Sequence, residues 1–291
     1  MSMVTFSQLG GRGRYGNSLL QRSWVKAYAT EHNASWGVAP WVGSHLFGLQ
    51  DPPVTGTLPA FAEKCEAGDV HKPLPPEGDE SIGRDYEGWM QFPTAWWTPE
   101  RRKVWRDYQP TEAWLERLRP ITEACAHSGT TIGIQIRRGD YGQGSCYDAV
   151  TPIGWYTEWL GEHWESFDRP SLFIATEDRS LVELFAPFAP VTVESLGVEL
   201  HAEPYPLYNY LAEDLTSGKA HLLDWFPEWY ALTQCDVLLA ANSTFSLTAA
   251  MVSNKTPEFW RPSWSDSAFI RENIWNCRPL RLDCPKSQSV A

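Results

Sequence analysis

Two adjacent arginines, Arg137 and Arg138, follow an alternating run of isoleucines in residues 130–142, TTIGIQIRRGDYG. The alternation predicts a buried strand, because successive side chains of a strand point to opposite faces. Ligands of open α/β sheets bind at the carboxyl ends of strands, and arginine donates two parallel hydrogen bonds to a phosphate. If the strand persists to its end, Arg137 points into a crevice and Arg138 points back into the fold. The two side chains could equally form structural salt bridges.

A glycine-rich stretch, residues 10–17, contains Arg14 and ends at Asn17. Its glycines allow the backbone to approach a ligand closely, and asparagine is a good helix N-cap. Apolar residues behind Asn17 recur at helical spacing, so we expect the turn to open a helix whose amino terminus attracts anions. The spacing is not that of the GxGxxG dinucleotide motif. Taken alone, the stretch is better explained as a tight loop with Asn17 as its cap.

A third candidate anion site lies at Ser243 and Thr244, between a strand expected at residues 237–241 and a helix that runs through Met251. In such a join, hydroxyl groups and free N–H groups converge at the positive end of a helix. The simpler alternative is an ordinary helix N-cap, which needs no ligand.

The composition is that of a soluble globular protein, with 291 residues, 43% hydrophobic and 21% charged. A formal net charge of −12 argues against a nucleic-acid partner, which requires a basic surface. None of the six cysteines forms a CxxC pair, so reduced thiols are expected, although Cys277 and Cys284 could pair. No apolar run reaches membrane-spanning length. We expect a cytoplasmic protein, with a lumenal domain trimmed of its anchor as the alternative.

The remaining pattern predicts strands and helices that alternate along the chain. Strands are expected at residues 4–9, 131–136, 172–176, 191–193 and 237–241, and helices after Asn17, Thr98, Thr111 and Thr151, over residues 226–235, and after Ser180 as the N-cap. Prolines interrupt residues 51–99. A boundary near His127 would divide the chain into domains 1–127 and 128–291, and residues from Pro279 onward are expected to form a tail.

Four short segments resemble motifs of one superfamily, the GDP-fucose-dependent fucosyltransferases of the α1,2-, α1,6- and protein O-fucosyl types. Residues 13–17, GRYGN, are similar to the GRFGNQ loop of that superfamily, and residues 136–141, IRRGDY, are similar to its HVRRGDY strand end. Residues 175–178, ATED, resemble ATDD, and residues 241–246, ANSTFS, are similar to the third motif. The four segments occur in the expected order, whereas residues 35–125 show no match.

The resemblance implies an α/β protein of the GT-B type, with two Rossmann-like domains facing across a cleft and the donor bound mainly by the second. It also implies an inverting, metal-independent transfer with no cofactor. The sequence contains no Asp-x-Asp pair for a divalent ion. Positive charge must then stabilise the leaving diphosphate, and the resemblance assigns the contact with the β-phosphate to Arg137.

The resemblance also implies roles for other residues. Those expected to bind substrate are Arg14, Gly16, Arg138, Asp178, Glu228, Ser243, Thr244 and Phe245, and those expected at the reacting centre are Arg137, Asn17 and Asp140. Glu228 stands where the superfamily places an aspartate that accepts from the guanine edge, a task that suits a carboxylate. Gln135 replaces the usual histidine, which puts that residue's nucleotide contact in doubt. Asp140 is the first candidate for a general base and Asp178 the second, although Asp140 could instead order its own loop.

These observations predict an enzyme that transfers L-fucose from GDP-fucose to a glycan hydroxyl, with the α1,2 type favoured by the IRRGDY and ANSTFS segments. The GRYGN segment favours the protein O-fucosyltransferases, so transfer to Ser or Thr of a protein is the first alternative. A non-catalytic protein that binds a sugar nucleotide or a glycan is the second alternative, supported by Gln135. Trp89, Trp96 and Trp97, three of 16 tryptophans, could stack on the acceptor sugar.

Overall fold

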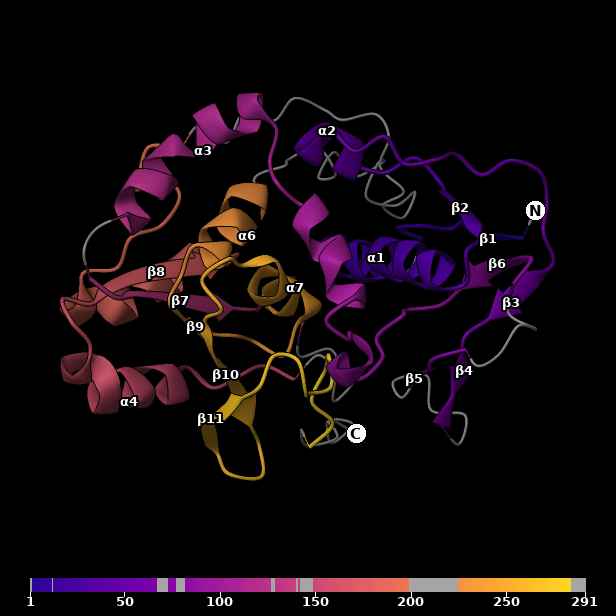
Figure 1. Ribbon diagram of the computed structural model, residues 1–291. Helices are drawn as coiled ribbons and strands as arrows, with labels where there is room; N and C mark the ends of the chain where they lie inside the picture. Colours follow the sequence, from indigo (N-terminus) through magenta and orange to yellow (C-terminus); the bar gives the residue numbers. More distant parts are fainter. Residues whose placement is uncertain are drawn as a thin grey trace. The chain divides into compact units, whose positions relative to one another are not determined.

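The computed structural model describes residues 2–11, 13–66, 73–76, 82–126, 129–139, 141, 149–198 and 225–283 (Figure 1). The described residues form two compact units, with the division between Leu115 and Glu116. The boundary expected from the sequence, after residue 127, stays a prediction. Asp140, His127 and Cys284, which the sequence predictions named, lie outside the described residues.

A four-stranded parallel sheet forms the centre of the first unit. Its order is β2 (Ser35–Val38), β1 (Met3–Phe6), β6 (Arg84–Glu87) and β3 (Ala60–Ala62). Helix α1 (Tyr15–Glu31) packs against β1 and β2. The strand expected at residues 4–9 therefore ends earlier, at Phe6, and the glycine-rich turn connects it to α1. A strand, a turn and a helix packed back on the sheet are the elements of a Rossmann-like half.

The other elements of the first unit are short, and those between residues 51 and 99 are limited by prolines, because proline cannot donate a backbone hydrogen bond to a helix or a sheet. They are α2 (Gly43–Phe47), β4 (Lys64–Cys65), β5 (Pro73–Leu74), η3 (Thr94–Trp96) and η4 (Arg101–Asp107). The helix expected after Thr98 is the 3₁₀ helix η4. The buried Arg22 of α1 forms ion pairs with Asp51, at 2.7 Å, and with Asp107, so it holds this part of the chain against α1.

A five-stranded sheet forms the second unit. Its order is β11 (Ala268–Glu272), β10 (Glu258–Ser263), β9 (Val237–Leu239), β7 (Thr131–Ile136) and β8 (Ser171–Thr176), with β11 the antiparallel strand. Strands β7, β8 and β9 lie where the sequence predicted them. The strand expected at residues 191–193 is reduced to a single bridge between Val191 and Phe173. Strands β10 and β11 were not predicted.

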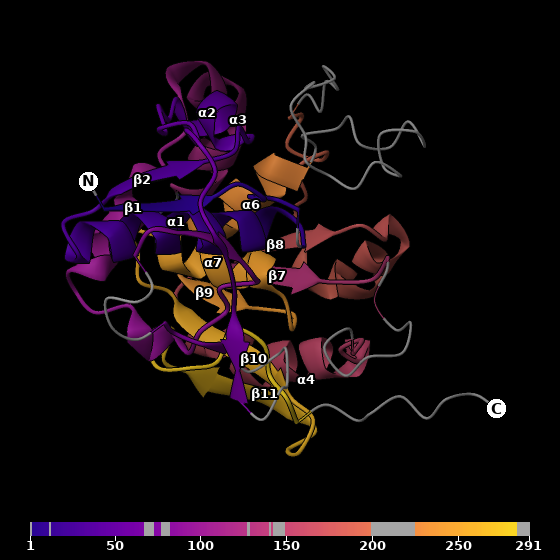
Figure 2. The same ribbon diagram turned by 90° about the vertical axis from the view of Figure 1, so that its right-hand side faces the viewer.

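The helices of the second unit cover both faces of its sheet (Figure 2). They are α3 (Glu112–Cys125), which spans the division between the units, α4 (Ile153–His163), η6 (Trp164–Ser166), η7 (Arg179–Phe188), α6 (Trp225–Thr233) and α7 (Thr244–Val252). Each lies within a few residues of a predicted helix, except η6, which was not predicted.

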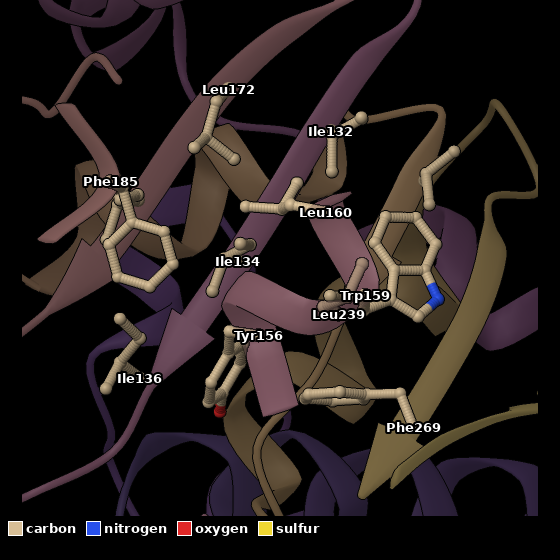
Figure 3. Close-up of a cluster of buried hydrophobic side chains, with 12 residues drawn as sticks. Ile132, Ile134, Ile136, Tyr156, Trp159, Leu160, Leu172, Phe185, Leu239 and Phe269 are labelled. Atoms are coloured by element: carbon tan, nitrogen blue, oxygen red, sulfur yellow. The ribbon is translucent and has the colours of Figure 1, made fainter. Parts of the chain in front are cut away.

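The central strand β7 is buried on both faces. Its isoleucines pack with Tyr156 and Leu160 of α4 and with Phe185 in a cluster of buried apolar side chains (Figure 3). On the other face, a Cβ atom at Gly133 would lie 2.5 Å from Sγ of Cys235, so the segment that follows α6 rests directly on the strand. A parallel strand with helices on both faces is the arrangement of doubly wound α/β folds.

Candidate functional site

The carboxyl ends of three parallel strands of the second unit meet at one edge of its sheet. Ile136 is the last residue of β7 and is paired with Thr176 of β8, and Ile134 is paired with Leu239 of β9. Among the described residues, those expected at the site in the second domain lie in the segments that follow these strands, apart from Glu228 on α6. The parallel register is what brings them to the same edge.

Arg137 lies just beyond β7, and its guanidinium group forms an ion pair with the carboxylate of Glu177, just beyond β8. The Arg137 side chain is 16% exposed and the Glu177 side chain 38% exposed. The backbone N–H of Arg138 donates to the second carboxylate oxygen, Oε2, at 3.1 Å. Because β7 ends at Ile136, strand alternation does not extend to Arg137, and its guanidinium meets Glu177 where the sequence predicted an open crevice.

Arg138 points its side chain at backbone carbonyl groups. Its Nη1 donates to the carbonyl oxygen of Arg137 at 2.8 Å, and its Nη2 donates to that of Thr151 at 3.3 Å. These bonds hold the segment after β7 against the segment that leads into α4. The direction agrees with the expectation that Arg138 points back into the fold, whereas a contact with substrate stays a prediction.

Tyr141 connects this segment to the loop after β9. Its ring lies against the guanidinium of Arg137, with 5.1 Å from Cζ to the ring centroid. Its hydroxyl donates to the backbone oxygen of Asn242 at 2.9 Å. Tyr141 is part of the IRRGDY segment, but no role was predicted for it, because nothing in the local sequence indicates a partner 101 residues away.

Ser243 is the N-cap of α7, and its Oγ accepts from the backbone N–H of Phe245 at 3.2 Å. Thr244 is the first residue of the helix, and both side chains are largely buried, whereas Phe245 is half-buried. The N-cap expected as the simpler alternative is therefore present. Phosphate binding at the same helix start stays a prediction.

Asn242, the residue before this cap, is fully buried and held by two arginines. Its Oδ1 accepts from Nη2 of Arg261 at 2.9 Å and from the backbone N–H of Arg281 at 2.7 Å. Arg261 itself is only 1% exposed and donates to the backbone oxygen of Pro279 at 3.1 Å. The prediction of a tail from Pro279 is thus wrong for the described residues up to position 283, because buried polar groups recruit their backbone.

Glu228 of α6 is 8% exposed and pairs with Arg179, whose Nη1 lies 2.6 Å from Oε1. Arg179 also pairs with Glu194 at 2.5 Å. Burial raises the pKa of Glu228 to about 7, even though the Arg179 guanidinium favours the ionised form. No role was predicted for Arg179, which directly follows the ATED segment. The available signal was its positive charge directly after two acidic residues, Glu177 and Asp178, which indicates a possible ion pair.

Asp178 is the N-cap of η7, where its Oδ1 accepts from the backbone N–H of Ser180 at 3.2 Å and from the Ser180 hydroxyl at 2.5 Å. The prediction that Ser180 caps this helix is wrong. The reason is that Asp178 has the extended backbone of a capping residue, from which its side chain reaches the N–H group two positions on. A role for Asp178 as base or substrate ligand stays a prediction.

The first-unit residues named by the sequence lie at the start of α1. The helix begins at Tyr15, so the exposed Arg14 occupies the N-cap position with extended backbone, and Asn17 and the buried Gly16 lie in the first turn. The prediction of Asn17 as N-cap is therefore wrong. Its Oδ1 instead accepts from Nε2 of Gln91 at 2.6 Å, which fixes the side chain.

The tryptophans proposed as an acceptor platform differ in exposure. Trp97 is 1% exposed and packs edge-on against Trp105, with ring centroids 5.0 Å apart, so it belongs to the core and cannot stack on a sugar. Trp89 and Trp96 are half-buried. The guanidinium of Arg101 covers one face of Trp96, at 4.2 Å from the ring centroid.

Within the part of the chain that the structure describes, no group of three or more His, Cys, Asp or Glu side chains has the arrangement of a metal site. None of the described helices combines the length and apolar character needed to cross a lipid bilayer.

No protein-family model matches the chain, and no curated protein is similar to it in sequence. Solved structures do match its fold. NodZ α1,6-fucosyltransferase soaked with GDP-fucose has 12% identity and a TM-score of 0.55, covering 94% of this chain and 99% of that chain. NodZ from Bradyrhizobium gives 12% identity and a TM-score of 0.52, covering 94% and 98%. A mutant of Arabidopsis thaliana FUT1 in complex with GDP gives 15% identity and a TM-score of 0.51, covering 93% and 73%. The resemblance noted in the sequence is thus confirmed at the level of the fold.

Proposed function

We propose that this protein transfers L-fucose from GDP-fucose to a hydroxyl of a glycan acceptor. The observation that carries the proposal is the donor set at the end of β7, where the Arg137 guanidinium and the Arg138 backbone N–H together bind a carboxylate. A phosphate offers the same kind of anionic oxygens to the same donors. The shared fold supports this assignment, because the matched structures were obtained with GDP-fucose and with GDP.

In the proposed reaction, the bond between C1 of fucose and the β-phosphate oxygen breaks while the acceptor oxygen attacks C1 from the opposite face. Negative charge grows on the departing diphosphate, and Arg137 stabilises it once Glu177 has turned away. The N–H groups at the start of α7, with the hydroxyls of Ser243 and Thr244, provide further donors. Arg137 and these donors take the part that a divalent ion plays in other transferases, so the transfer is proposed to be metal-independent. Attack on C1 from the face opposite the diphosphate makes it inverting.

The acceptor hydroxyl must release a proton, for which a carboxylate is the natural base. Asp140 and Asp178 are the candidates, and Asp178 already accepts hydrogen bonds from Ser180 through one oxygen. Glu228 is proposed to accept from the N–H groups of the guanine edge, which requires its ionised form and its release from Arg179. The α1,2 linkage, the GT-B arrangement and the domain boundary after residue 127 belong to the same proposal.

The central experiment compares the protein with its Arg137→Ala variant, using labelled GDP-fucose and a glycan array, followed by linkage analysis of the product. We expect transfer to be lost, while the unfolding free energy changes by about 1 kcal/mol or less, because the ion pair is partly solvated. The matched control is Arg169→Ala, which removes an exposed arginine that pairs with Asp168 in the same unit.

Full transfer by the Arg137→Ala variant would refute the role of the guanidinium. Folded protein domains presented beside the glycans decide the acceptor class, since labelling of protein Ser or Thr alone would contradict a glycan acceptor.

A further inference from the structure

We infer that Tyr141 is a positioning residue, which holds the Arg137 guanidinium at a set place relative to the start of α7. The inference rests on the proposed function, in which these two groups bind the same diphosphate. Tyr141 reaches both of them, one through its ring and the other through its hydroxyl.

A tight turn directs the Tyr141 ring back toward Arg137. The backbone N–H of Tyr141 donates to the carbonyl oxygen of Arg138 at 2.9 Å. Within this turn Gly139 has φ +58°, in the left-handed region that glycine adopts without strain. The turn therefore brings a ring four positions further along the chain to within 5.1 Å of the guanidinium carbon.

The contact with the ring leaves the guanidinium able to bind an anion. A ring attracts a cation through its face, whereas a guanidinium donates its hydrogen bonds in its own plane. The ring can thus stay in contact with Arg137 while the carboxylate of Glu177 gives way to a phosphate. Arg137 would not have to be reoriented when the ligand arrives.

The hydroxyl of Tyr141 donates its hydrogen bond to an acceptor that is held in place by other residues. It donates to the backbone oxygen of Asn242, whose side chain is fixed by Arg261 and by the backbone of Arg281. Asn242 is fully buried, and the next residue, Ser243, caps α7. A single side chain, that of Tyr141, thus connects the guanidinium to the residue that precedes the N-cap of α7. Preset donors bind and stabilise a diphosphate better than donors that must be ordered on binding.

The test uses the full chain with Tyr141→Phe, which removes the hydroxyl, and Tyr141→Leu, which also removes the ring. Binding of GDP and of inorganic pyrophosphate is measured by calorimetry, and kcat and KM are measured for GDP-fucose. We expect Tyr141→Phe to raise both Kd values about fivefold, the effect of one hydrogen bond, with an almost unchanged melting temperature. Tyr141→Leu should weaken binding further and lower kcat.

Two controls separate positioning from a general effect on folding. Tyr230→Phe removes another hydroxyl of the second unit, one that lies 3.1 Å from Oγ1 of Thr122, and should leave both Kd values unchanged. In the Arg137→Ala background, Tyr141→Phe should have no effect on pyrophosphate binding, because the group it positions is gone.

Unchanged binding and kinetics in Tyr141→Phe and Tyr141→Leu, together with weakened binding in Arg137→Ala, would overturn the inference and leave the proposed function intact. Failure of the unaltered protein to bind GDP would instead contradict the proposed function. Pyrophosphate binding that depends on Tyr141 would then still support the positioning role at an anion site.

Discussion

Replacing Glu177 by glutamine should strengthen the binding of GDP. The Glu177 carboxylate occupies the donors that the proposed function assigns to the diphosphate, namely the guanidinium of Arg137 and the backbone N–H of Arg138. A diphosphate can bind there only after that carboxylate has left. The wild-type protein therefore loses an ion pair on binding, and Glu177→Gln has no such pair to lose.

The size of the effect follows from the exposure of the pair. Arg137 is mostly buried and Glu177 is 38% exposed, so the pair contributes about 1 kcal/mol, the upper end of the range for solvated ion pairs. A glutamine oxygen can still accept from the Arg138 N–H, so that bond need not change. We therefore expect the Kd for GDP to fall about fivefold. The difference should shrink in high salt, which screens solvated charges.

The assay is calorimetric titration of GDP into the wild-type protein, Glu177→Gln and a control at low and high salt. Glu183→Gln is the matched control, because it removes the same charge from an exposed position on η7, and it should leave the Kd near the wild-type value.

Weaker binding of GDP to Glu177→Gln would refute this reasoning. It would mean that Glu177 contributes to the bound state, for example by accepting from a sugar hydroxyl, and that it is no competitor of the ligand. Equal tightening in Glu183→Gln would show an effect of net charge alone.

Two further predictions concern stability. Gly133→Ala should lower the unfolding free energy by about 1–3 kcal/mol through overpacking, because the new methyl group meets Sγ of Cys235 at 2.5 Å. In denaturant titrations, adding Cys235→Ala should restore part of the lost unfolding free energy. An unfolding free energy that is not restored at all would contradict the steric cause. Burial raises the pKa of Glu228 to about 7, so the folded protein favours the protonated carboxyl, and its unfolding free energy should fall as pH rises from about 4.5 through 7. Measured against Glu228→Gln, whose amide does not titrate, the fall should be about 2–3 kcal/mol, and a constant difference between the two proteins would contradict it.

Much of the second unit could be predicted because its signals are local. Alternating isoleucines predicted β7, and short apolar runs predicted β8 and β9 at their observed places. Strand β10 was missed because it contains Arg261 and Pro262, residue types that are unusual in a buried strand. The arginine is acceptable there only because Asn242 and distant backbone oxygens accept from it.

The candidate site was predicted in outline, but some details of the prediction were wrong. Ser243 caps α7 as the sequence pattern indicated. Asn17 and Ser180 were predicted as N-caps three and two positions after the residues that occupy the N-cap positions of α1 and η7, because the first turn depends on how the preceding loop is held. Arg179 was not singled out, since its partner Glu228 lies 49 residues further along the chain.

The amino-acid order alone determined that Arg137, Glu177 and Ser243 follow three strands, and parallel pairing then requires them to share one edge of a sheet. Only the tertiary structure decided which carboxylate faces which guanidinium, how deeply Glu228 is buried, and that Tyr141 reaches Asn242. The physical reason is the range of the interactions. Backbone preferences and capping act within a few residues, whereas ion pairs and burial depend on segments that only the packed fold brings together.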